Sequence, residues 1–68
     1  MTQEFKAEFE QESDGRWIAD FPELPGAMAY GSTKEGAFAA AQAIALRIIA
    51  DRVEQSHRGA DNLHFAHV

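Results

Sequence analysis

Four carboxylates near the N-terminus are the side chains of this sequence best suited to chemistry. They are Glu8, Glu10, Asp14 and Asp20. Two-metal catalysis needs several such groups converging on ions about 3.5–4 Å apart. Arg16 and Lys6 can neutralise two of the four across neighbouring strands, so the pattern favours a solvated strand face. We therefore predict no catalytic residue and no bound metal or cofactor at these positions.

Histidine and serine offer two further chemistries. His64 and His67 form an H-x-x-H motif, whose rings lie on opposite faces of a strand but can share one face of a helix. Only the shared face allows joint chelation of a metal ion. The serines at positions 13, 32 and 56 have no activating base that the sequence reveals, and nucleophilic catalysis requires one. The prediction remains a protein that is not an enzyme.

The segment DFPELPG at residues 20–26 predicts a stiff loop between two apolar runs. Proline followed by glycine is typical of a type II turn, with Pro25 at the first central position and Gly26 at the second. Turn chemistry alone is one account of the loop. The other adds a binding role for Glu23 and Leu24, because an apolar side chain held out beside an acid is a low-entropy contact point. The predicted partner-binding residues are Glu23, Leu24, Glu8 and Asp20.

Composition limits the class of protein. The chain has 68 residues and no cysteine, and a domain of about 60 residues buries only roughly 60% of its unfolded surface. Self-association as a homodimer or homotetramer is therefore expected. Eleven acidic and six basic residues give a formal charge of -5, which favours a basic partner over a nucleic acid. The sequence shows no signal peptide and no apolar run of about 18 residues, so we expect a cytoplasmic protein that does not bind membranes.

Alternation of apolar and charged residues predicts a hairpin near the N-terminus. Strands are expected at residues 3–11 and 16–21, with SDG at 13–15 as the turn. The register that places Phe9 opposite Trp17 stacks apolar residues on one face and also aligns opposite charges on the other. The expected charge pairs are Glu10 with Arg16 and Lys6 with Asp20.

Two further strands complete the expected sheet. Residues 27–31 read AMAYG, with Met28 and Tyr30 on one face. Residues 62–67 alternate apolar and polar positions and could return as a strand beside the first one, or form a frayed tail. Residues 1–68 thus predict a single α+β domain, a two-layer β-β-β-α-β fold whose mixed sheet has the order 3-2-1-4 and carries one long helix on one face.

The helix is expected over residues 33–57. Either Thr33 caps its N-terminus, or Ser32 caps it with Glu35 completing a capping box, and Gly59 is a plausible C-terminal stop. Its apolar stripe should cover the sheet. The stripe consists of Phe38, Ala41, Ile44, Ala45, Ile48 and Ile49.

Several of these segments together resemble the HicB-like antitoxin family. The segments are FKAEF, SDGRWIADFPELPG and AYGSTKEGA, and the resemblance extends over residues 5 to about 50. P-x-L-P-G followed by G-x-T before an alanine-rich helix is its most specific part. The resemblance implies a partial RNase H-like β-β-β-α-β fold that forms dimers or tetramers. It also implies binding and neutralisation of a small basic mRNA interferase of the HicA type.

This resemblance makes an antitoxin-like binding protein of a HicA/HicB-type toxin–antitoxin system the expected function. The alternatives are a stand-alone oligomer with a ligand-binding or structural role and, less favoured, a metal-dependent RNase H-like nuclease. Antitoxins of this family commonly carry a C-terminal DNA-binding domain. Because this chain ends at Val68, we expect it to be a short stand-alone member without direct DNA binding.

Overall fold

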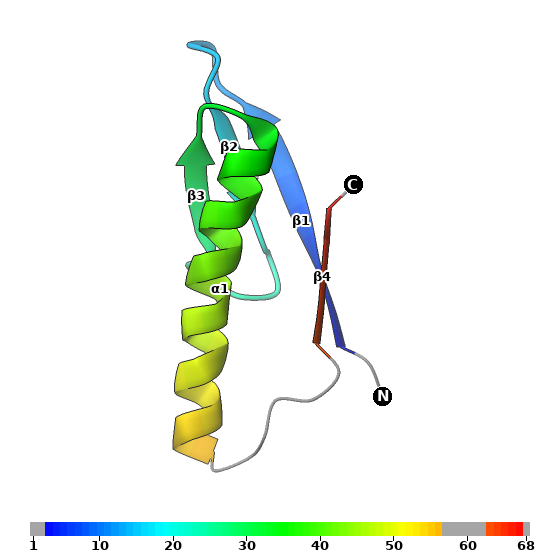
Figure 1. The fold of residues 1–68 in the computed structure, drawn as a ribbon, viewed down its shortest axis with the longest axis vertical. Helices are drawn as coiled ribbons and strands as arrows, with labels where there is room; N and C mark the ends of the chain where they lie inside the picture. Colours follow the sequence, from blue (N-terminus) through cyan, green and yellow to red (C-terminus); the bar gives the residue numbers. More distant parts are fainter. Residues whose placement is uncertain (1–2, 57–62, 68) are drawn as a thin grey trace.

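The computed structural model describes residues 3–56 and 63–67, which form a four-stranded sheet and one long helix (Figure 1). The elements are β1 (Gln3–Gln11), β2 (Trp17–Asp20), β3 (Met28–Gly31), α1 (Lys34–Ser56) and β4 (Leu63–His67). The strand order β3-β2-β1-β4 confirms the predicted α+β fold and its sheet order. The predicted boundaries at residues 57 and 62, and the predicted helix stop at Gly59, lie outside the described residues.

The last strand is present, so the segment is not a frayed tail. β4 pairs in parallel with β1, and the remaining pairs are antiparallel, which makes the sheet mixed. Phe65 lies opposite Phe5 in this pairing, and the two rings stack with centroids 5.3 Å apart. Phe65 also meets the edge of Phe21, at 5.5 Å. Aromatic contact therefore joins the last strand to the core.

The core combines large side chains from the sheet with small ones from the helix. Ala37, Ala41 and Ala45 are 0% exposed, and their spacing of four residues places them on one face of α1. The predicted stripe lies on the sheet as expected, with Ala41, Ala45 and Ile49 buried and its other members partly buried. Methyl groups at these positions let the helix axis approach the sheet closely, and the aromatic rings of the strands fill the remaining volume.

The predicted register of the first hairpin is wrong by two residues. Phe9 lies opposite Ala19, and Trp17 lies opposite Gln11. A shift of two residues leaves every side chain on its predicted face, because side chains alternate with a period of two. The expected cross-strand charge pairs are lost, however. The observed pairs are Glu8 with Asp20 and Glu10 with Ile18.

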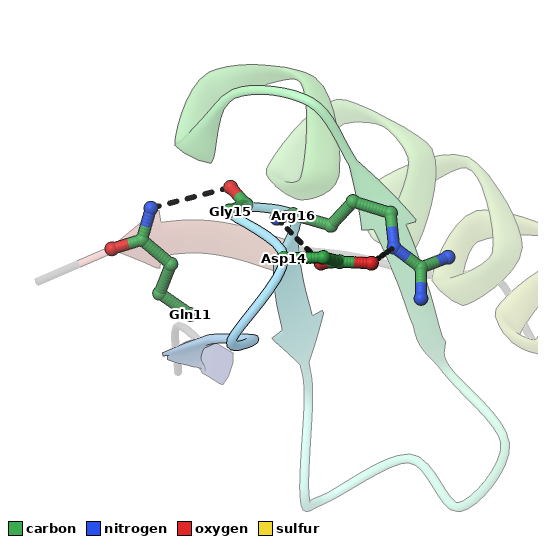
Figure 2. Close-up of polar contacts among 4 residues, drawn as sticks. All are labelled: Gln11, Asp14, Gly15 and Arg16. Atoms are coloured by element: carbon green, nitrogen blue, oxygen red, sulfur yellow. Dashed lines mark hydrogen bonds and ion pairs between the residues drawn. The ribbon is translucent and has the colours of Figure 1, made fainter.

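The turn explains this register (Figure 2). The backbone N–H of Glu12 donates to the carbonyl of Arg16 at 2.7 Å, and the N–H of Gly15 donates to the carbonyl of Glu12 at 2.9 Å. Gly15 has φ of 94°, so the loop of residues 13–15 is a turn closed by a left-handed glycine. Asp14 accepts from the N–H of Arg16 at 3.0 Å and from its Nε at 2.9 Å. Arg16 is therefore held by the turn rather than by Glu10.

The environment of the Asp14 carboxylate predicts how the stability of the turn depends on pH. Its pKa lies below the ordinary value of 3.8, chiefly because its carboxylate accepts the N–H of Arg16 and also because it faces the guanidinium. A lowered folded-state pKa stabilises the turn above the unfolded-state pKa, and this stability is lost as pH falls through the folded-state value. A carboxyl titration by NMR should place Asp14 below 3.8. In Arg16→Gln the backbone donor remains, so the pKa should stay depressed; an ordinary value in both proteins would contradict this origin.

The helix begins at a tight junction with β3. Thr33 caps it, because the N–H of Gly36 donates to Thr33 Oγ1 at 2.9 Å and the N–H of Ala37 to the Thr33 carbonyl at 3.0 Å. This resolves the two expected caps in favour of Thr33 over Ser32. A Cβ on Gly31 would collide with the backbone nitrogen of Ala37 and lie 2.9 Å from its Cα. Only glycine permits the first turn of α1 to lie so close to the end of β3.

We predict that Gly31→Ala destabilises the fold by about 1–3 kcal/mol or more, because backbone atoms cannot move aside as a flexible side chain would. Urea unfolding followed by circular dichroism measures the loss. Ser32→Ala is the matched control, since Ser32 is exposed and its free energy of unfolding should change by less than about 0.5 kcal/mol. Equal stability of Gly31→Ala and the parent chain would contradict the close approach.

Candidate functional site

The face of the sheet opposite α1 carries a shallow groove of about 200 Å³. It lies across β1, β2 and β3, and apart from Phe9, which packs against the core, its lining residues occupy positions that alternate with the core positions of each strand. The lining residues are Glu8, Phe9, Glu10, Ile18, Asp20 and Met28. Neither Ile18 nor Met28 was predicted to contribute to a binding site, although strict alternation along the strands was the signal that could have identified them.

The groove holds three negative charges that form no ion pair in the described part of the chain. Glu8 lies directly opposite Asp20 in the antiparallel pair, and Glu10 follows on the same face of β1. In residues 3–56 and 63–67, no ion pair or side-chain hydrogen bond engages these three carboxylates. The expected partner of Asp20, Lys6, instead approaches Glu4 at 3.8 Å. Like charges directly opposite each other destabilise a strand pair.

An apolar surface adjoins the acids. Ile18 is half-buried, and Met28 is 45% exposed. Beyond the groove, Tyr30 continues this surface, with the guanidinium of Arg16 4.8 Å from its ring centroid. Lysine and arginine have apolar stems and charged heads. A groove with an apolar floor and carboxylates around it can therefore hold a long basic side chain along its whole length.

The proline loop does not present Leu24 to a partner. The predicted type II turn is present, since the N–H of Ala27 donates to the Leu24 carbonyl at 2.9 Å and Gly26 has φ of 93°. Leu24 is nevertheless 0% exposed and packs in the core with Phe21. The expectation that it projects from the loop is wrong, because a second turn, closed by the Leu24 N–H donating to the Phe21 carbonyl at 2.9 Å, curls the loop back onto the sheet.

The four predicted partner-binding residues thus separate into three places. Glu8 and Asp20 meet in the groove. Glu23 is exposed on the proline loop and does not line the groove. Leu24 belongs to the core.

Of the residues weighed for catalysis and metal binding, Glu8, Glu10 and Asp20 lie together in the groove, and the others lie elsewhere. Asp14 belongs to the hairpin turn with Arg16, and Ser13 and Ser32 are exposed. His64 lies opposite Glu4 and His67 opposite Ala7 in the backbone pairing, and the side chains of both histidines lie outside what the structure describes, as does that of Ser56. In the described part of the chain, no group of three His, Cys, Asp or Glu residues is arranged to hold a metal ion.

Comparison of the chain with protein-family models, curated proteins and solved structures gives no match in any of the three. Over the two described stretches, no helix has the length and apolar character needed to span a membrane. The fold and the site define a small α+β domain with an acidic, partly apolar groove on the uncovered face of its sheet.

Leu24→Ala tests the assignment of this residue to the core. We expect a loss of about 2–5 kcal/mol in the free energy of unfolding, as for other fully buried leucines. Its neighbour provides the control, since Glu23→Ala changes an exposed residue and should cost less than about 0.5 kcal/mol. Thermal or urea unfolding distinguishes the two. A Leu24→Ala chain as stable as Glu23→Ala would show that the side chain is not buried.

Proposed function

We propose that the chain is an antitoxin-like binding protein of the HicA/HicB type, which acts without catalysis in the cytoplasm by binding a small basic mRNA interferase. The observation that carries the proposal is the acidic groove. Its three carboxylates lie beside the apolar side chains of Ile18 and Met28 and form no ion pair among the described residues.

Electrostatics supports a basic partner. The chain carries a formal charge of -5, and a cleft lined by one sign of charge steers an oppositely charged protein toward it. Inserting a lysine or arginine between Glu8 and Asp20 would also relieve the repulsion between these two acids. Binding at the groove would therefore gain both from the new ion pairs and from the removal of an unfavourable contact.

The nature of the partner rests on the sequence resemblance rather than on the groove. The segments SDGRWIADFPELPG and AYGSTKEGA resemble those of HicB-like antitoxins, whose partners are small basic RNA-cleaving toxins. The groove and the resemblance are independent, and both favour a basic partner.

The proposal is tested by the gene next to the one that encodes this chain. A small basic open reading frame should lie there, its product should cleave mRNA in vitro, and the purified chain should inhibit that cleavage in proportion to the complex formed. Addition of salt should weaken the complex, because ion pairs at an exposed groove are screened. If no such frame exists, or if its product cleaves RNA equally well with and without the chain, the proposal is rejected in favour of a stand-alone oligomer.

The groove itself is tested by two matched double variants. Glu8→Gln with Asp20→Asn removes two charges from the groove, whereas Asp51→Asn with Glu54→Gln removes two exposed charges from α1. Calorimetric titration with the neighbouring toxin should show binding weakened by about 10-fold, or about 1.4 kcal/mol, for the groove variant. The helix variant should remain within a few-fold of the parent chain. Equal weakening by both would mean that net charge alone, not the groove, attracts the toxin.

A further inference from the structure

No strand of the described residues pairs with the outer edge of β3. β3 is the terminal strand of the order β3-β2-β1-β4, and its inner side pairs with β2. The N–H of Phe21 donates to the Ala27 carbonyl at 2.9 Å. Because backbone groups of an antiparallel strand point alternately to its two sides, Ala29 faces β2, whereas Met28 and Tyr30 direct their backbone groups away from the sheet. The Met28 N–H turns back to the Gly26 carbonyl at 3.0 Å, and the Tyr30 N–H points outward.

Apart from its short length of four residues, this edge lacks the features that usually prevent strands from pairing. Met28–Gly31 contains no charged residue and no proline, which are the common protective devices of edge strands. The large hydrophobic residues exposed in the described part of the chain are Met28 at 45%, Tyr30 at 50% and Leu46 at 48%. Two of these three lie on a strand of four residues. Backbone donors and acceptors flanked by such side chains are suited to another strand.

The charge of the chain favours a second copy over a basic partner at the β3 edge. The formal charge of -5 makes two copies of the chain repel each other wherever acids meet. The β3 edge is neutral, and the guanidinium of Arg16 lies over Tyr30 at 4.8 Å. A basic partner gains no ion pair from this edge, whereas a second copy meets the least repulsion there.

We propose that β3 pairs antiparallel with β3 of a second copy, about a two-fold axis at Ala29. In this register Met28 lies opposite Tyr30 of the other copy, so both exposed side chains become covered, and sulfur–aromatic contact is favourable. The Tyr30 N–H of each chain donates to the Met28 carbonyl of the other. These two bonds form without breaking any bond of the single chain.

The geometry of this dimer follows from its symmetry. The two-fold axis runs perpendicular to the sheet, so both α1 helices lie on one face and both grooves lie on the other. Phe38 contacts Phe9 and Phe21 on the inner side of α1, and Ala40, two residues further along, lies on the opposite flank. One continuous eight-stranded sheet then presents two acidic grooves side by side.

The dimer is tested by sedimentation equilibrium over a dilution series of the full chain. The parent protein should have twice the 7.5 kDa mass of one chain. Tyr30→Lys places a charge on the edge and should halve this mass. The matched control is Leu46→Lys, which changes the net charge equally at a residue of similar exposure on α1 and should leave the dimer intact.

A parent chain that sediments at 7.5 kDa at every concentration overturns the proposal. It is equally overturned if Tyr30→Lys stays dimeric, or if both lysine variants dissociate. If circular dichroism shows that Tyr30→Lys is unfolded, hydrogen exchange on the parent chain tests the dimer instead. Protection of the Tyr30 amide that rises with protein concentration supports the dimer, and protection independent of concentration rules it out.

Discussion

The long helix α1 packs tightly on one face of a four-stranded sheet, and the rest of the structure depends on this contact. Ala37, Ala41 and Ala45 are fully buried along it, and the backbone of the first helical turn touches Gly31. Small side chains on the helix leave room for the aromatic residues of the strands. The buried apolar side chains of the described residues thereby lie between the helix and one face of the sheet. The other face carries Ile18, Met28 and Tyr30, and no described element covers it.

The uncovered face is not arranged for stability. An antiparallel pair with one solvated face usually gains from opposite charges across the strands, and this chain contains the lysine and arginine to supply them. Lys6 instead approaches Glu4, and Arg16 is held by Asp14 in the turn. Glu8 and Asp20 are left opposite each other beside exposed apolar side chains. This arrangement lowers the stability of a domain that is small and therefore only marginally stable. Such a cost is expected where the groove binds a partner.

Periodicity explains what could be predicted from the sequence and what could not. Alternation with a period of two assigns Phe5, Phe9 and Met28 to their faces, and a helical stripe assigns Ala41 to the core, because each depends on local geometry. Alternation could not fix the hairpin register, because two registers that differ by two residues place every side chain on the same face. The choice between them depends on the three-residue loop that Asp14 and Gly15 close. The burial of Leu24 depends on a long-range contact with the core. The groove depends on the alternation and on the hairpin register together, and the sequence predicted two of its acids as binding residues but neither Ile18 nor Met28.

The most direct test of the view that the open face is kept for binding needs no partner. Glu8→Lys converts the repulsive pair with Asp20 into an attractive one, so the free energy of unfolding should rise by about 0.2–1 kcal/mol. Glu23→Lys, with the same change of charge on the exposed proline loop, corrects for net charge. We expect Glu8→Lys to be the more stable of the two at low salt, with the difference lost in concentrated salt. If Glu8→Lys is instead the less stable chain, Glu8 stabilises the fold, and its place in the groove is structural.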